Sequence, residues 1–119
     1  MNNFEVRPWG EFRVLFENKK CKVKVLEINP GCSISLQSHR SRNEFWYIVQ
    51  GHPLIMIKDK VYYSNPKDTY EVEKTSKHRI INSSEFEKCI IIEIQTGSYF
   101  GEDDIVRYED QYGRNIIVK

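Results

Sequence analysis

Residues 43–63 read NEFWYIVQGHPLIMIKDKVYY, and this stretch decides the fold class. It contains three runs rich in Val, Ile, Tyr and Phe, at 43–50, 54–57 and 60–63, separated by turn residues around 50–53 and 59–60. Short β-branched and aromatic runs bounded by Gly, Pro and Asp are typical of strands joined by tight turns. The stretch therefore predicts three consecutive β-strands.

The same pattern of short apolar runs separated by turn residues continues on both sides of this stretch. Further runs of this kind lie at 12–15, 21–28, 33–37, 69–73, 78–81 and 88–95. No segment places apolar residues at i, i+3, i+4 and i+7 over three turns, which a surface helix requires. The chain also has no repeat and no plausible linker, so we predict one all-β domain over 1–119, a sandwich or small barrel with little helix.

Composition argues against several classes of partner, among them nucleic acids and membranes. The 119 residues carry 18 Lys+Arg and 17 Asp+Glu, a formal net charge of +1, so no overall field attracts nucleic acid or anionic lipid. No span of about 20 apolar residues exists to cross a bilayer, and residues 1–10 lack a secretory pattern. The three cysteines include no C-x-x-C pair and indicate reduced thiols. We expect a cytoplasmic protein with no nucleic-acid or membrane partner.

Two of the three histidines lie in patterns that suit metal binding. Gln37 and His39 are spaced i, i+2, which places both side chains on one face of a strand. Glu44 shares a face with Trp46, and an unpaired carboxylate inside an apolar barrel is costly unless a cation neutralises it. His78 lies far downstream on another predicted strand.

Together these side chains offer two imidazoles, one carboxylate and one amide oxygen. This donor set suits one divalent ion, and does not distinguish Zn, Mn, Fe, Co and Ni. The alternative interpretation is a surface His39, a hydrogen-bonded strand His78 and a Glu44 that faces water.

The pattern resembles a known family. Gly31, Gln37, His39, Glu44 and Gly51 match the first cupin motif, and His78 and Asn82 match the end of the second. More specifically, the chain resembles the C-terminal cupin domain of type II mannose-6-phosphate isomerases, often fused to mannose-1-phosphate guanylyltransferase. Further segments carry this resemblance: Arg7-Pro-Trp-Gly10, Ile92-Glu-Ile-Gln-Thr-Gly97 and Gly101-Glu-Asp-Asp-Ile-Val-Arg107-Tyr-Glu-Asp110-Gln-Tyr-Gly113-Arg114.

The resemblance implies a jelly-roll barrel, or double-stranded β-helix, and a metal ion held by Gln37, His39, Glu44 and His78. It also implies an aldose–ketose isomerase that interconverts mannose 6-phosphate and fructose 6-phosphate for sugar-nucleotide or polysaccharide synthesis. An N-terminal arm of about 1–11 and a C-terminal segment of about 101–119, packed back on the barrel, are expected.

A phosphosugar isomerase needs a base and a cationic site for the phosphate. The candidates for proton transfer are Glu44, His78 and Lys24. Lys24 points inward if Leu26 and Ile28 form the core face of 21–28, and into solvent if Cys21, Val23 and Val25 do. The candidates for substrate binding are Arg7, Arg42, Arg79 and Arg107.

Departures from the family pattern keep other functions open. Arg40 and Ser41 stand where the family often has His, and Glu73 and Thr75 replace a Pro-x-Gly turn. These changes favour a non-catalytic cupin that binds a sugar or nucleotide sugar. A third possibility is an iron-dependent dioxygenase that uses His39, Glu44 and His78. By analogy with cupins, we expect a homodimer formed through edge strands.

Overall fold

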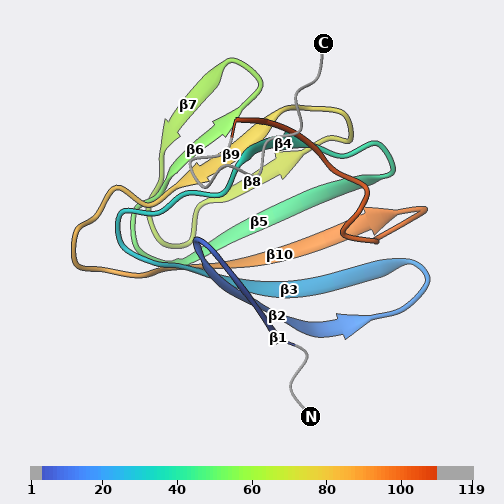
Figure 1. The fold of residues 1–119 in the computed structure, drawn as a ribbon, viewed down its shortest axis with the longest axis horizontal. Coiled ribbons are helices and arrows are strands. Elements are labelled where there is room, and N and C mark those ends of the chain that lie inside the picture. Colours follow the sequence, from blue (N-terminus) through green and yellow to red (C-terminus); the bar gives the residue numbers. More distant parts are fainter. Residues whose placement is uncertain (1–3, 110–119) are drawn as a thin grey trace.

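The computed structural model describes residues 4–109, and within that range the chain forms eleven β-strands and no helix (Figure 1). The strands are β1 (Phe4–Arg7), β2 (Gly10–Glu17), β3 (Cys21–Ile28), β4 (Leu36–Ser38), β5 (Arg42–Gln50), β6 (Leu54–Ile57), β7 (Lys60–Tyr63), β8 (Thr69–Val72), β9 (His78–Ile81), β10 (Cys89–Gly97) and β11 (Val106–Glu109). No helix in this range could span a membrane.

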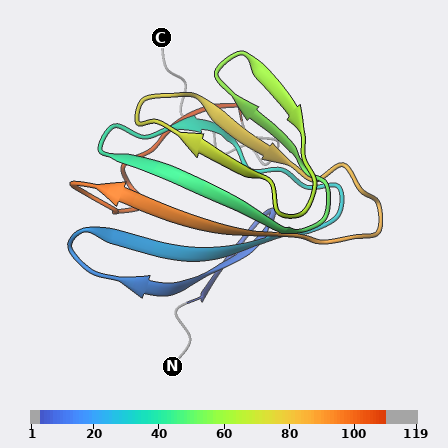
Figure 2. The same ribbon diagram turned by 180° about the vertical axis from the view of Figure 1, so that it is seen from behind.

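The strands form two antiparallel sheets that face each other, as both ribbon views show (Figures 1 and 2). The larger sheet has the order β1-β2-β3-β10-β5-β8, and the smaller has the order β11-β4-β9-β6-β7. Neighbours such as β3 and β10 are far apart in sequence, so distant segments meet inside the barrel. The all-β jelly-roll prediction is confirmed.

Three details differ from the predicted strands. The run at 33–37 is strand only from Leu36, and Ser33 makes an isolated bridge to Ile81. The other two are β1 and β11, which form at the ends of their sheets from segments with few buried residues. Such strands depend on a paired neighbour rather than on an apolar pattern of their own.

The core lies between the two sheets. Trp46, Ile48, Ile55, Ile80 and Ile91 are completely buried there. Each buried side chain of this size stabilises the fold by about 1.5–3 kcal/mol relative to an exposed one.

The inward-facing side chains change from apolar to polar along β3, β5 and β10, the three central strands of the larger sheet. On β5, the inward residues run from Ile48 and Trp46 to Glu44 and Arg42. β3 and β10 change in the same direction, and their registers align the polar positions: Glu93 pairs with Lys24 on one side and with Trp46 on the other. The barrel therefore has one apolar end and one polar end, and the polar end holds the candidate site.

Gly51 shows why the turn after β5 needs glycine. Its φ is +90°, and a Cβ there would lie 2.8 Å from Cys89 Sγ. Neither the left-handed backbone nor this close approach accommodates a side chain.

Candidate metal centre

His39, Glu44 and His78 converge at the polar end of the barrel. His39 follows β4, Glu44 lies on β5 and His78 begins β9, and all three are at most 4% exposed. His39 Nδ1 lies 3.4 Å from Glu44 Oε2, and His78 Nε2 lies 3.8 Å from Glu44 Oε1. One potential ligand atom from each residue lies within 4.8 Å of the other two. The structure thus brings together three of the four predicted ligands in one buried cluster.

Hydrogen bonds orient both imidazoles. His78 Nδ1 donates to Ser76 O at 3.0 Å, which turns Nε2 toward Glu44. Such a second hydrogen bond is the usual way to fix a metal-ligating histidine. The other ring accepts from Arg42 Nη2 at 2.9 Å through Nε2, so neutral His39 carries its proton on Nδ1.

The electrostatic environment keeps His39 neutral and Glu44 ionised. Burial lowers the pKa of His39 to about 3, with further lowering by Arg42 and His78. Burial alone would raise the pKa of Glu44, but His78 and Arg42 outweigh it and hold the pKa of that carboxyl below its usual range. A neutral imidazole and an ionised carboxylate are the forms that bind a cation.

The donor chemistry fits a divalent ion. A first-row ion binds nitrogen and oxygen at about 2.0–2.2 Å, so its adjacent ligands lie roughly 3–3.5 Å apart. The distances of 3.4 and 3.8 Å join the two imidazoles to different oxygens of Glu44, and the set with one atom from each residue lies within 4.8 Å, which is looser than this range. Gln37, the fourth predicted ligand, lines the same cavity and pairs with His78 in the strand register, while its amide nitrogen donates to Ser35.

Arg42 lies inside this cluster. Its Nε donates to Glu44 Oε2 at 3.0 Å, and its side chain is 4% exposed. The guanidinium is therefore the positive counter-charge of the Glu44 carboxylate. A cation at His39 Nδ1 requires the ring proton on Nε2, so cation binding there and the Arg42 hydrogen bond exclude each other.

Glu93 is a second buried carboxyl group, which the sequence analysis did not single out. Trp46 Nε1 donates to Glu44 Oε1 and to Glu93 Oε1, each at 3.1 Å, and Gln95 donates to the other Glu93 oxygen. Burial and the adjacent charge of Glu44 raise the pKa of Glu93. The cavity thus holds two carboxyl groups with opposite pKa shifts, bridged by one indole.

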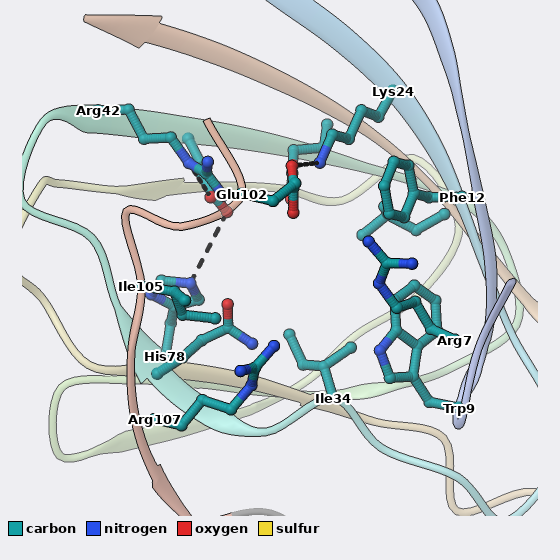
Figure 3. Close-up of a pocket in the computed structure, with 14 residues that line it drawn as sticks. Arg7, Trp9, Phe12, Lys24, Ile34, Arg42, His78, Glu102, Ile105 and Arg107 are labelled. Carbon is teal, nitrogen blue, oxygen red and sulfur yellow. Dashed lines mark hydrogen bonds and ion pairs between the residues drawn. The ribbon is translucent and has the colours of Figure 1, made fainter. Parts of the chain in front are cut away.

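A cavity opens beside the cluster, and Figure 3 shows charged side chains around its rim. The lining residues are Arg7, Trp9, Phe12, Lys24, Leu26, Ile34, Gln37, Arg42, Glu44, His78, Glu93, Glu102, Ile105 and Arg107. Lys24 points inward, as the Leu26/Ile28 alternative predicted, and its ammonium donates to Glu102 Oε2 at 2.5 Å. Lys24 Nζ also lies 4.0 Å from the centre of the Phe12 ring.

The structure also shows where two of the predicted substrate-binding arginines and a tryptophan lie. Arg79 does not line this cavity: it donates to Ile34 O and pairs with Glu109 at 3.4 Å. Arg7 lines the cavity and also pairs with Glu5 at 2.6 Å. Trp9, which lies between Arg7 and Gly10 in the family segment, is 7% exposed and belongs to the core.

The acidic C-terminal segment contacts the barrel through individual carboxylates. Glu102 binds Lys24, and Asp104 accepts from the backbone amides of Arg40 and Ser41. Asp110 and Arg114, which the resemblance also includes, lie outside the described residues.

Two antiparallel sheets that enclose a His/Glu/His cluster at one polar end define a cupin. The chain belongs to the family described as mannose-6-phosphate isomerase C-terminal, whose model matches residues 2–110. A relative from Pseudomonas putida, alginate biosynthesis protein AlgA, is 39% identical over 95% of this chain and 23% of its own length.

Other relatives share this extent of similarity. Xanthan biosynthesis protein XanB of Xanthomonas campestris is 37% identical over 91% of this chain and 23% of its own. A mannose-1-phosphate guanylyltransferase of Salmonella montevideo is 38% identical over 92% of this chain and 23% of its own. The chain therefore spans about a quarter of these relatives, which include proteins named for polysaccharide biosynthesis.

Solved structures support the fold. A cupin-2 domain from Rhodospirillum rubrum has a TM-score of 0.72 at 16% identity, over 87% of this chain and 78% of that one. The capsular polysaccharide assembling protein CapF of Staphylococcus aureus has a TM-score of 0.75 at 18% identity, over 92% and 34%.

Proposed function

We propose that the protein is a metal-dependent aldose–ketose isomerase that interconverts mannose 6-phosphate and fructose 6-phosphate, or a closely related phosphosugar. Its products would supply sugar-nucleotide and polysaccharide synthesis. The observation that carries the proposal is the buried cluster of His39, Glu44 and His78 on the wall of a charged cavity. Membership of the isomerase C-terminal family supports the reaction class.

The charge of the cavity suits an anionic substrate. Four cationic side chains line it, Arg7, Lys24, Arg42 and Arg107, against the three carboxyl groups Glu44, Glu93 and Glu102. The raised pKa of Glu93 reduces the negative charge. A bound divalent ion would make the balance still more positive. Guanidinium groups bind phosphate through paired charge-assisted hydrogen bonds.

The reaction moves a proton between C1 and C2 of the sugar. When bound by His39, Glu44 and His78, the metal ion would supply Lewis-acid stabilisation of negative charge on the substrate oxygens. Glu44, His78 and Lys24 all line the cavity and are the candidates for moving the proton. Apolar side chains, including Trp9, Phe12 and Ile34, line other parts of the wall and limit access of water.

Opposite walls of the cavity have different roles in this proposal. Arg7 and Arg107 lie away from Arg42 and Glu102 in Figure 3, and we assign the phosphate to these two arginines. Glu102, held by Lys24, can accept hydrogen bonds from sugar hydroxyl groups, whereas its charge repels phosphate.

A coupled assay of purified protein tests the reaction. Fructose 6-phosphate should be converted to mannose 6-phosphate in the presence of a divalent ion. Chelation should abolish the activity, and readdition of the ion should restore it. Activity that persists after complete removal of metal would contradict the proposed role of the cluster.

A second candidate is a non-catalytic cupin that binds a phosphosugar. The contact of Arg42 with both Glu44 and His39 favours it, because an internal guanidinium already balances the carboxylate. Tight binding of fructose 6-phosphate to metal-replete protein without turnover would select this function.

A further inference from the structure

The Arg42 guanidinium joins two of the three candidate metal ligands. Its Nε donates to Glu44 Oε2 at 3.0 Å, and its Nη2 donates to His39 Nε2 at 2.9 Å. A guanidinium presents its N–H donors in a rigid planar fork, and here the fork spans a carboxylate and an imidazole. Arg42 therefore holds the same two side chains that a divalent ion would bind.

Neither ring nitrogen of His39 can bind a cation while Arg42 keeps this position. Binding through Nδ1, which lies 3.4 Å from Glu44 Oε2, requires the ring proton on Nε2, and a protonated Nε2 cannot accept from Arg42. Binding through Nε2 requires the place that Arg42 Nη2 occupies. Both routes break the hydrogen bond between Arg42 and His39, and a cation beside Glu44 also repels the guanidinium.

The guanidinium can find a new partner in the cavity once this hydrogen bond is broken. The Arg42 side chain lines the cavity and is 4% exposed. Its Nη1 atom is buried, and no acceptor for it is found among residues 4–109. A buried donor without an acceptor costs free energy, so the guanidinium is still short of one oxygen partner. A phosphosugar in the cavity would bring several oxygen acceptors.

We propose that Arg42 is an internal competitor of the metal ion, and that it becomes a substrate-binding residue when a bound ion displaces it from His39. The freed guanidinium then donates to sugar oxygens at the end of the cavity that holds Glu44. This inference rests on the proposed function and adds an order of events to it, because Arg42 is available to the substrate only after it has released His39.

The exchange of partners couples the two binding events. A substrate that holds Arg42 away from His39 removes the competitor, and therefore strengthens metal binding. By thermodynamic linkage, the metal ion must strengthen substrate binding by the same factor. Metal-free protein should consequently bind the phosphosugar more weakly than metal-loaded protein.

Calorimetric titration of the purified full chain with Zn²⁺ at neutral pH tests the competition without any turnover. Arg42→Gln keeps a hydrogen-bond donor for Glu44 but has neither the charge nor the fork. Its dissociation constant for Zn²⁺ should be at least about tenfold lower than that of the wild type, because no charge-assisted contact has to be broken. Equal or weaker binding would overturn the proposal, since Arg42 would then have no effect on the ion or would position Glu44 for it.

Two further variants guard this comparison. Arg40→Gln removes the same charge from an exposed side chain of the same loop, where solvent screens it, and should change the Zn²⁺ dissociation constant by no more than about twofold. An equal effect of Arg40→Gln would overturn the proposal. If circular dichroism shows that Arg42→Gln does not fold, Arg42→Lys decides: it keeps the buried charge without the fork and should still bind Zn²⁺ more tightly than the wild type, whereas equal or weaker binding would overturn the proposal.

Saturating fructose 6-phosphate tests the role of Arg42 toward the substrate. It should lower the Zn²⁺ dissociation constant of the wild type at least about fivefold, and clearly less in Arg42→Gln. The same ratio in both proteins would overturn that role. Unchanged Zn²⁺ affinity in Arg42→Gln beside an active wild type would overturn this inference alone, whereas absence of Zn²⁺ binding in every variant would overturn the metal-dependent function as well.

Discussion

A Glu44→Gln variant is expected to lose fructose 6-phosphate isomerisation by at least about a thousandfold, since metal stabilisation and positioning together contribute several kcal/mol. Glu44 is the one carboxylate of the metal cluster, and it contacts both imidazoles and Arg42. Glutamine removes the negative charge that attracts a cation and leaves the buried Arg42 guanidinium without its counter-charge. Steady-state assays with saturating divalent metal measure the effect.

Loss of folding must be separated from loss of chemistry in this variant. Removing one partner of a buried ion pair costs about 3–5 kcal/mol, so thermal unfolding by circular dichroism should accompany the assay. Glu17→Gln, an exposed carboxylate at the end of β2, is the control and should keep full activity. A folded Glu44→Gln protein with more than about a tenth of wild-type activity would contradict the assignment, because that loss is below 1.4 kcal/mol.

An Arg107→Gln variant is expected to raise the KM for fructose 6-phosphate by roughly 10- to 100-fold, because a charge-assisted hydrogen bond contributes about 1.5–3 kcal/mol. Arg107 lies on β11 and its side chain lines the cavity. A phosphate-binding role acts on ground state and transition state alike, so kcat should change much less than KM. Inorganic phosphate should likewise become a weaker competitive inhibitor.

Arg79→Gln is the matched control for Arg107→Gln. Arg79 belongs to the same sheet but directs its guanidinium to Ile34 O and Glu109 rather than to the cavity. Its KM should remain within about twofold of the wild type, a change of about 0.4 kcal/mol, because its guanidinium does not line the cavity. An equal or larger effect at Arg79 would show that the phosphate site lies elsewhere.

Much of the fold was predictable because Gly and Pro mark the turns between strands in the sequence. Gly51 and Pro53 separate two strands whose predicted and observed bounds differ by only one residue. On β5, alternation placed Glu44 on the same face as Trp46, but Phe45, Tyr47 and Val49 make the other face apolar too, so the inward position of Glu44 was decided only by the structure.

Alternation failed where both faces of a strand are apolar. On β3, Val23 and Val25 compete with Leu26 and Ile28 for the core, and only pairing with β2 and β10 decides that Lys24 points inward.

The same ambiguity concealed Glu93. The segment Ile90–Gln95 has isoleucines at 90, 92 and 94, so pattern alone favours these positions in the core and Glu93 in solvent. The structure reverses this, because Trp46 and Gln95 satisfy the buried carboxyl group by hydrogen bonds. Partners contributed by other residues are a property of the assembled barrel and leave no periodic signal in the strand.

The metal content of purified protein shows whether His39, Glu44 and His78 together hold one divalent ion. The protein is loaded with a small molar excess of metal, and the unbound metal is removed by dialysis. Elemental analysis should then give one ion per chain for the wild type and none for His78→Ala. Lys77→Ala, the adjacent residue, should match the wild type. Equal metal in the wild type and in His78→Ala would contradict the account.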